Sequence, residues 1–245
     1  MKIKDVRSMK LTMQLKSRSY DIILKAGCLT NLHQFTNVAN RKVFVLTDSG
    51  VPAEYAQTVA AQCPDSTVYT IPRGEGSKCL KVYGQVLQAM LAFGMDRKDL
   101  LVSVGGGVVG DLAGFVASTY MRGIPFVQVP TSLLAMVDSS VGGKTAVDLP
   151  AGKNLVGAFC QPSLVLCDPH ALSTLPDPVF YDGCAEVIKA AMLKSHAFFE
   201  DLQKTPPREQ LEHMLEFCIS MKRDVVEEDE FDTGARQYLN LGHTF

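Results

Sequence analysis

A glycine-rich turn at residues 105–110 constrains the fold of this chain more than any other feature of its sequence. The run before it, Leu100–Val104, has the pattern of a short buried strand, and the apolar run after it has the pattern of a packed helix. A strand that passes through glycines directly into a helix is typical of a βαβ unit. The turn therefore predicts a largely parallel sheet.

The spacing of these glycines also indicates a ligand. Gly105, Gly107 and Gly110 match G-x-G-x-x-G, in which backbone N–H groups at a helix N-terminus can approach a pyrophosphate. A tight turn that only packs the helix on its strand is the alternative interpretation. Such dinucleotide sites normally have an acidic residue ~20 positions further on to hold the ribose, but the stretch 125–130 carries none. Asp48, at the end of an earlier predicted strand, is the best candidate for that role.

The rest of the first 176 residues continues the alternation of strands and helices. Apolar residues recur at helical spacing between Leu80 and Leu91, and Ser77 is the expected N-cap of this helix. Further strands are expected at Val43–Thr47, Phe126–Val129 and Leu164–Cys167. The sequence thus predicts an α/β fold, with a Rossmann-like domain over residues 1–176.

Residues 177–245 have a helical period throughout, after prolines that end the preceding pattern. One helical segment is expected over Tyr181–Phe199 and another after Pro207, with Thr205 as a cap and Pro206 in the first turn. We therefore expect an all-α domain over residues 177–245. Two segments are few for a core of their own, which indicates an incomplete domain.

Composition excludes several classes of protein. The 245 residues carry a formal net charge of −2, which argues against a nucleic-acid binder driven by bulk charge. No apolar stretch approaches the roughly 18 residues of a membrane span, and the start of the chain lacks the apolar segment of a secretory signal. The 7 cysteines form no C-x-x-C pair and are typical of reduced packing residues. We expect a cytoplasmic protein.

Several lysines and arginines occupy positions where a positive charge is energetically costly or unusual. Lys222 falls within the apolar stripe of the second helical segment, where a lysine either extends to solvent or meets an anion. Arg122, Lys144, Lys153 and Arg236 adjoin glycines or polar turns. This pattern favours a local site for a small molecule with several negative charges, and ordinary turns are the alternative.

Residues 138–145 resemble the phosphate-binding loop G-x-x-x-x-G-K-[ST], but Asp138 replaces the first glycine. We therefore do not expect an NTP-hydrolysing loop. Asp138 and Lys144 either pair with each other or face polar groups of a ligand.

Glu186 and Lys189 are three positions apart, so an ion pair on one helix face is the simplest interpretation. Glu186 and His243 together would supply part of a catalytic zinc site, which usually has three protein ligands. Spacing by itself does not establish a metal.

Six motifs, in order, resemble the 3-dehydroquinate synthase family, a branch of the sugar phosphate cyclases. They are GGGVVGDLAGFVASTYMRG (105–123), VPTSLLAMVDSSVGGKTAVD (129–148), GKNLVGAF (152–159), TLP (174–176), AEVIK (185–189) and LNLGHTF (239–245). The resemblance extends from about Asp21 to the last residue.

The resemblance implies a Rossmann-like domain, a helical domain and a site in the cleft between them. It implies conversion of a seven-carbon keto acid phosphate (DAHP) into 3-dehydroquinate and phosphate in the shikimate route. NAD would be reduced and regenerated within one turnover, and a divalent metal, zinc or cobalt, would polarise the substrate hydroxyl. The family is homodimeric, and its counterpart of Arg122 reaches the phosphate of the partner's substrate.

The resemblance also implies roles for individual residues. The family's metal ligands match Glu186 and His243. Its cofactor contacts match Asp48, Glu75, Lys78, Gly106, Gly107, Asp111, Thr131, Ser132, Lys144, Lys153 and Asn154. Its substrate contacts match Asp138, Lys144, Lys153, Lys189, Lys222, Arg236 and Asn240.

Three other functions stay open at this point. The chain could be another sugar phosphate cyclase, a metal- and NAD-dependent polyol dehydrogenase, or a noncatalytic NAD-binding fragment. Lys222, Arg236 and Asn240 favour dehydroquinate synthase over other cyclases, because the counterparts of these residues vary there.

The sequence stops inside the family pattern Gly-His-Thr-Phe-Gly-His, before its second histidine and before the third metal ligand, which the family takes from a later His-Gly-Glu segment. We therefore expect a C-terminally truncated chain with little or no activity, because a metal site with two ligands is poorly preorganised. Phosphate release from DAHP by this chain, compared with a form that continues through the missing ligands, measures the difference. Equal turnover of the two forms would contradict the expectation.

Overall fold

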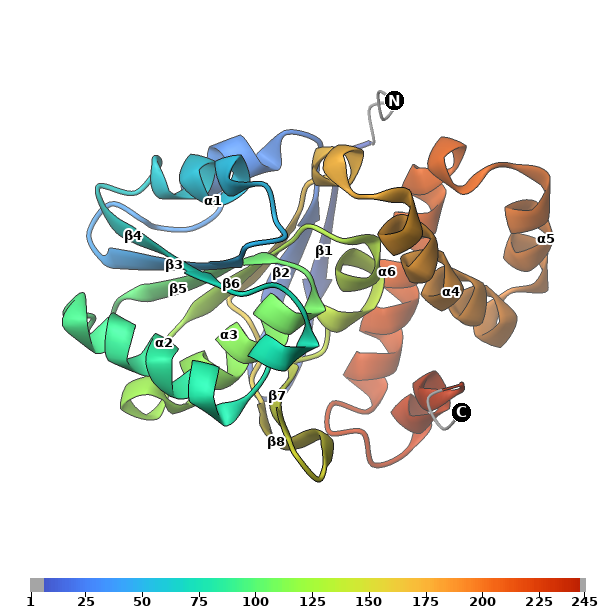
Figure 1. Ribbon diagram of the computed structural model, residues 1–245. Helices are drawn as coiled ribbons and strands as arrows, with labels where there is room; N and C mark the ends of the chain where they lie inside the picture. Colours follow the sequence, from blue (N-terminus) through green and yellow to red (C-terminus); the bar gives the residue numbers. More distant parts are fainter. Residues whose placement is uncertain (1–6, 243–245) are drawn as a thin grey trace.

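The structure of the protein is a computed structural model that describes residues 7–242. At its centre is a seven-stranded sheet in the order β1-β2-β9-β6-β5-β3-β4 (Figure 1). All neighbouring strands are parallel except β1 and β2, which are antiparallel. The strands are β1 (Met9–Met13), β2 (Tyr20–Leu24), β3 (Lys42–Asp48), β4 (Asp65–Ile71), β5 (Leu100–Gly105), β6 (Phe126–Pro130) and β9 (Leu164–Cys167). The strands predicted from the sequence are confirmed.

Both faces of the sheet are covered, as is usual for parallel strands. Val43 and Val45 of β3 pack in the cluster under α1 (Ala53–Ala60), whereas Phe44 and Leu46 pack with α2 (Leu80–Ala92) and α3 (Gly107–Thr119). Successive side chains of a strand point to opposite faces, so an uninterrupted apolar run serves both layers. Short 3-10 turns complete this part: η1 (Cys28–Gln34), η2 (Glu75–Ser77), η3 (Tyr120–Arg122) and η5 (Pro169–Thr174).

The predicted cap of α2 is wrong, although the helix itself is confirmed. The N-cap is Cys79, and the Ser77 hydroxyl instead donates to the Pro72 carbonyl at 2.5 Å. Lys78 lies between them with ψ 59°, outside the helical region, so the turn at Ser77 cannot continue into α2.

The predicted helix over Tyr181–Phe199 is two helices. They are α4 (Asp177–Lys194) and α5 (His196–Lys204). Ser195 between them is extended at φ −154°, and its hydroxyl accepts a hydrogen bond from the Phe198 N–H at 3.2 Å. A capping serine therefore ends one helix and starts the next.

The cap predicted at Thr205 is also wrong. Thr205 follows α5, and the next helix, α6 (Leu211–Glu228), begins only after the single turn η6 (Pro207–Glu209). Thr205 and Pro206 each precede a proline, which disfavours helical dihedral angles, and both residues are extended.

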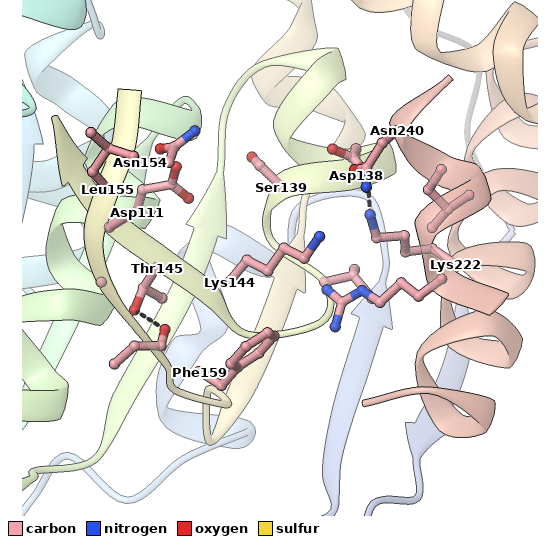
Figure 2. Close-up of a pocket in the computed structure, with 16 residues that line it drawn as sticks. Asp111, Asp138, Ser139, Lys144, Thr145, Asn154, Leu155, Phe159, Lys222 and Asn240 are labelled. Atoms are coloured by element: carbon pink, nitrogen blue, oxygen red, sulfur yellow. Dashed lines mark hydrogen bonds and ion pairs between the residues drawn. The ribbon is translucent and has the colours of Figure 1, made fainter. Parts of the chain in front are cut away.

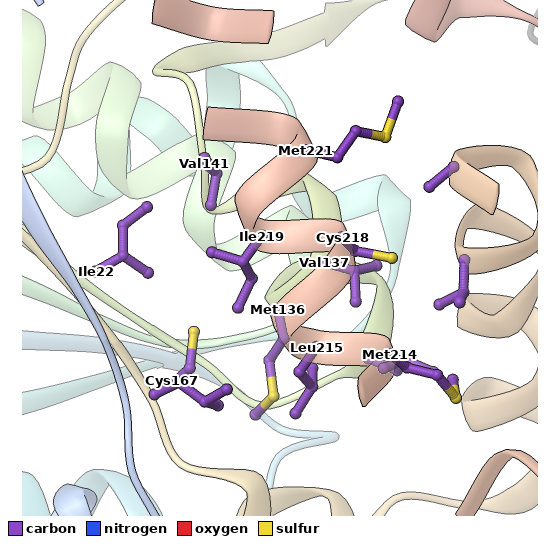
Figure 3. Close-up of a cluster of buried hydrophobic side chains, with 14 of the residues drawn as sticks. Ile22, Met136, Val137, Val141, Cys167, Met214, Leu215, Cys218, Ile219 and Met221 are labelled. Atoms are coloured by element: carbon purple, nitrogen blue, oxygen red, sulfur yellow. The ribbon is translucent and has the colours of Figure 1, made fainter. Parts of the chain in front are cut away.

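The helical part shares a core with the edge of the sheet. Ile22 of β2 and Cys167 of β9 belong to the same buried cluster as Met136, Leu215 and Ile219 (Figure 3). This explains how so few helical segments are stable here, since β1, β2 and β9 supply the other half of their core. The division into two domains at residue 176 stays a prediction.

A second, two-stranded sheet stands beside the main one. It is the antiparallel pair β7 (Lys144–Leu149) and β8 (Gly152–Phe159). A π-helical turn, η4 (Ala135–Ser139), leads into it through Gly142 and Gly143, both with positive φ. Residues 138–145 thus open into a strand instead of the helix that a P-loop requires, as expected.

Within residues 7–242, the helices are too short or too polar to cross a lipid bilayer.

Substitution of Gly114 in α3 tests the close packing of this helix on β7. A Cβ there would stand 2.2 Å from Thr145 Cγ2 and 3.2 Å from Phe126 Cζ. We expect G114A to lower the free energy of unfolding by about 1–3 kcal/mol, because a β-branched threonine cannot easily move away.

Gly84 in α2 is the matched control, since a Cβ placed there meets no atom of the described residues within 4 Å apart from its chain neighbours and its own helix's backbone. We expect G84A to raise the free energy of unfolding by about 0.5–1 kcal/mol. Urea unfolding measures both variants, and effects of the same sign would contradict the packing argument.

Candidate active site

The carboxyl ends of β3 and β5 mark the point where the strand order reverses. From β3 the chain proceeds to β4 on one side, and from β5 it proceeds to β6 on the other. Ligands of open α/β sheets bind in the crevice at such a point. Asp48 ends β3, and the preceding residue, Thr47, pairs with Val104 of β5. The structure therefore brings the predicted ribose acid beside the glycine-rich turn.

The glycine-rich turn has the strand–turn–helix form that the sequence predicts. α3 begins at Gly107, and among the described residues no side chain caps the helix at Gly106. The N–H groups of its first turn therefore lack intrahelical partners and can bind an anion. A Cβ on Gly107 would lie 3.1 Å from the Ser139 hydroxyl, so the turn leaves little room for a side chain.

Two further predicted cofactor residues lie beside this turn, at the end of β6. The Thr131 N–H donates to the Gly105 carbonyl at 2.9 Å, and Thr131 is buried. The Ser132 hydroxyl accepts a hydrogen bond from the Ala135 N–H at 3.3 Å. These contacts connect the turn to η4, which carries Asp138.

Lys78 is a buried connection between three segments. Its Nζ lies 2.5 Å from Asp111 Oδ2 on α3 and 2.6 Å from Asn154 Oδ1 on β8. Glu75, three positions before Lys78, pairs with Lys153 at 3.3 Å, and the Lys153 side chain is 72% exposed. Glu75 and Lys78 thus belong to two different ion pairs, one exposed and one buried.

The surroundings of Asp111 change the pKa of its carboxyl group. Burial raises the pKa of Asp111 from 3.8 to about 6, and the nearby carboxylates of Asp138 and Glu75 act in the same direction. Lys78 opposes this change by stabilising the charged carboxylate.

A cavity of about 520 Å³ opens between the β7–β8 hairpin, η4, α6 and the 3-10 turn η7 (Ala235–Asn240) (Figure 2). The residues that line it come from positions between 111 and 240 of the sequence. The predicted site residues that line it are Asp111, Asp138, Lys144, Asn154, Lys222, Arg236 and Asn240.

Lys222 of α6 forms an ion pair with Asp138 of η4. The two side chains are 12% and 25% exposed, so the pair lies at the inner wall of the cavity. The interpretation that this lysine meets an anion is confirmed, and the anion in the structure is a carboxylate of the protein. Since η4 directs Asp138 toward α6, the alternative pairing of Asp138 with Lys144 is wrong.

Lys144 instead pairs with a residue of the loop after α6. Its Nζ lies 2.6 Å from Asp232 Oδ2, and the Lys144 side chain is 44% exposed at the cavity. The positive φ of Gly142 and Gly143 redirects the chain between Asp138 and Lys144, which separates the two charges.

Arg236 is a buried cation, 1% exposed. Its Nη1 donates to the Glu230 carbonyl at 2.7 Å, and its Nη2 donates to the Gly142 carbonyl at 2.8 Å. Its Nε finds no hydrogen-bond partner among the residues described. Burial lowers the pKa of Arg236, whereas the negative charges of Asp232 and Asp138 raise it. A guanidinium held by two neutral carbonyls leaves positive charge for an anionic ligand.

Glu186 and Lys189 form the expected ion pair, at 2.6 Å. The Lys189 Nζ also donates to the Leu239 carbonyl at 2.6 Å, and both side chains line a small pocket that Asp138 and Lys222 share. His243, the other predicted metal ligand, lies outside the described residues. Within residues 7–242, no three His, Cys, Asp or Glu side chains are close enough to hold a metal ion.

Some predicted residues lie away from the cavity. Arg122 is exposed at the end of η3 with a positive φ of 71°. Asp48, at the switch point, accepts a hydrogen bond from the Gly50 N–H at 2.7 Å. The structure thus forms two neighbouring groups, one at the glycine-rich turn and one at the cavity, and leaves Arg122 at the surface.

The sequence analysis missed Asp232 and Phe159. Asp232 stands in the acidic run from 227 to 232, which has the pattern of a solvated loop. Phe159 ends β8 and packs edge-on against Phe231, with ring centroids 5.4 Å apart. Their positions depend on how the loop after α6 folds onto the hairpin, and local sequence patterns do not specify that contact.

Comparisons with known proteins identify relatives along the whole described fold. Residues 68–182 match the family model of the 3-dehydroquinate synthase N-terminal domain, and residues 183–245 match that of its C-terminal domain. A 3-dehydroquinate synthase of Clostridium beijerinckii is 44% identical over 244 residues, which are 96% of this chain and 70% of the relative.

Solved structures of sugar phosphate cyclases are also similar. A 2-deoxy-scyllo-inosose synthase complexed with carbaglucose-6-phosphate, NAD+ and Co2+ superposes with a TM-score of 0.88 at 29% identity, covering 96% of this chain and 68% of the other. A 2-epi-5-epi-valiolone synthase from Streptomyces hygroscopicus, with NAD+ and Zn2+ bound, gives 0.79 at 28%, covering 95% and 68%.

The raised pKa of Asp111 predicts a specific dependence of stability on pH. Between pH ~4 and ~6 the folded chain holds a proton on Asp111 that the unfolded chain releases. Relative to D111N, which cannot titrate there, the wild-type chain should lose up to about 3 kcal/mol of stability as pH rises from about 4 to 7.

Urea unfolding of both proteins across this pH range measures the effect. D201N, at an exposed ion pair with Lys204, is the control and should follow the wild type. A wild-type advantage over D111N that grows with pH would contradict the raised pKa.

Proposed function

The chain belongs to the 3-dehydroquinate synthase family, and from that premise we propose that it converts DAHP into 3-dehydroquinate and phosphate. The product is an intermediate of the shikimate route to aromatic amino acids, as the family name implies. The enzyme is a lyase that acts on a carbon–oxygen bond to phosphate.

One observation carries the choice of substrate. Lys144, Lys222 and Arg236 converge on a single cavity next to the crevice where an α/β sheet binds its nucleotide. DAHP carries a carboxylate and a phosphate, so it needs several cations in one cavity. A neutral polyol needs none, and the cavity therefore favours the cyclase function over a polyol dehydrogenase.

NAD fits the crevice at the glycine-rich turn. The uncapped first turn of α3 offers N–H groups to the pyrophosphate, and Asp48 stands at the adjacent strand end for the ribose. Glu75, Lys78, Asp111, Thr131, Ser132 and Asn154 border the same region and are the other cofactor residues that we propose. A bound NAD would supply a reversible hydride acceptor for the substrate.

The residues of the cavity bind, orient and stabilise charge. Lys222 and Arg236 hold the carboxylate with help from Asn240, and Lys144 holds the phosphate. Lys153, which pairs with Glu75 outside the cavity lining, is a further proposed contact of the phosphate. Cations fixed in a partly closed cavity stabilise the negative charge that develops on the leaving phosphate. Asp138 holds the Lys222 side chain in place at the cavity, because its carboxylate pairs with the ammonium group.

A divalent metal, zinc or cobalt, is the second cofactor of this family. Of the residues described, Glu186 is a proposed ligand, and its ion pair with Lys189 lies at the small pocket that Asp138 and Lys222 also line. The described residues by themselves do not form a metal site, since no group of three ligands comes together among them. The roles proposed above for the cavity residues do not depend on the metal.

The oligomeric state, the cellular location and the domain boundary are also proposals. A homodimer is supported by the exposed position of Arg122, which could reach the substrate phosphate of a second subunit. We also propose a cytoplasmic location, and a boundary near residue 176 between the Rossmann-like and helical domains, where α4 begins at Asp177.

Release of phosphate from DAHP, without net accumulation of NADH, tests the function. The assay contains NAD and Co2+ or Zn2+ and is run on this chain and on the longer form described above. Turnover should stop with a chelator, and K222Q should lower kcat/KM at least about 100-fold, because Asp138 then loses its counter-ion.

K204Q, at an exposed ion pair, is the control and should turn over like the parent. Net reduction of NAD by glycerol, with no phosphate release from DAHP, would instead support a polyol dehydrogenase. Binding of NAD with no turnover of DAHP by either form would support a noncatalytic protein.

A further inference from the structure

Lys144, a cation of the cavity wall, forms an ion pair with Asp232, so the protein itself supplies its counter-ion. Lys144 begins β7, and Asp232 lies in the loop between α6 and η7. The two charged atoms are 2.6 Å apart. An anionic ligand that binds Lys144 must therefore compete with a carboxylate that is already there.

The loop delivers Asp232 to this position at a conformational cost. Asp232 has φ 59°, in the left-handed region that costs a residue with a side chain about 1 kcal/mol. The Asp229 carboxylate fixes the loop, since it accepts hydrogen bonds from the N–H groups of Thr233, Gly234 and Arg236. The position of Asp232 is thus imposed by the fold of the loop around it.

The carboxylate of Asp232 is incompletely satisfied where it stands. Its Oδ2 pairs with Lys144, but its buried Oδ1 finds no hydrogen-bond partner among residues 7–242. The neighbouring Arg236 Nε and Gln161 Oε1 are also buried without partners in this part of the chain. Such atoms destabilise the arrangement, so a ligand that reorders it recovers free energy.

The other cations of the cavity are held differently. Lys222 is 12% exposed and pairs with Asp138 on the inner wall, and Arg236 binds two backbone carbonyls. Lys144, 44% exposed, is the most accessible of the three. Because solvent screens an exposed pair, exchange of its carboxylate for another anion costs least there.

We propose that Asp232 is a positioning residue that serves as an exchangeable counter-ion of Lys144. It holds the ammonium group at the cavity when no ligand is bound and yields it to the phosphate group of the substrate. This role of Asp232 depends on the proposed function only for which substrate carries the phosphate group. Asp232 thereby sets how tightly the site binds phosphate.

Binding of inorganic phosphate, measured by calorimetry on the whole chain, tests the proposal without turnover. D232N should bind phosphate about three- to fivefold tighter than the wild type, because the competing charge is removed. D232E should restore the wild-type affinity, and D201N, remote from the cavity, should not change it. In a K144Q background, D232N should have no effect.

Equal or weaker binding by D232N, or an effect of D232N that persists with K144Q, would overturn the proposal. A crystal structure of the wild type with phosphate gives a second readout that needs no variant. The separation of Lys144 Nζ and Asp232 Oδ2 should grow beyond about 4 Å. An intact pair beside bound phosphate would also overturn the proposal, whereas failure of the longer form to convert DAHP would overturn the proposed function alone.

Discussion

The buried guanidinium of Arg236 is the contact on which the shape of the cavity depends. It joins the loop after α6 to the start of the β7–β8 hairpin through the carbonyls of Glu230 and Gly142. Burying a charge in this way is costly unless the group is hydrogen-bonded. The contact also requires glycine at 142, where φ is 100° and a Cβ would lie 2.4 Å from Arg236 Nη2.

Around this contact, cations and carboxylates from distant parts of the chain meet in pairs. Lys78 meets Asp111, Lys222 meets Asp138, and Lys144 meets Asp232. Each pair joins two different elements of the fold. Loss of one partner destabilises such a site more than the pair stabilises it, because the remaining charge stays buried. The same charges that bind an anionic substrate therefore also fix the walls of the cavity.

The sequence predicts those features that local patterns determine. Strands, the glycine-rich turn and the odd position of Lys222 in an apolar stripe all follow from periodicity, and the structure confirms them. The partner of Lys222 does not follow, since Asp138 lies 84 positions away and reaches it only through η4. The sequence does not reveal that one helix ends and the next begins at Ser195, because apolar residues continue at helical spacing across it. Asp232 has no local signal, since its role depends on how its loop packs.

The apolar cluster shared by α4, α6 and the β1–β2 edge has a mechanical consequence. Met13, Ile22, Phe180 and Leu215 belong to one continuous core, so we expect the sheet and the helices to unfold together. Wide separation of two lobes would expose that core to water. We therefore expect small molecules to enter the cavity through movements that leave this core packed.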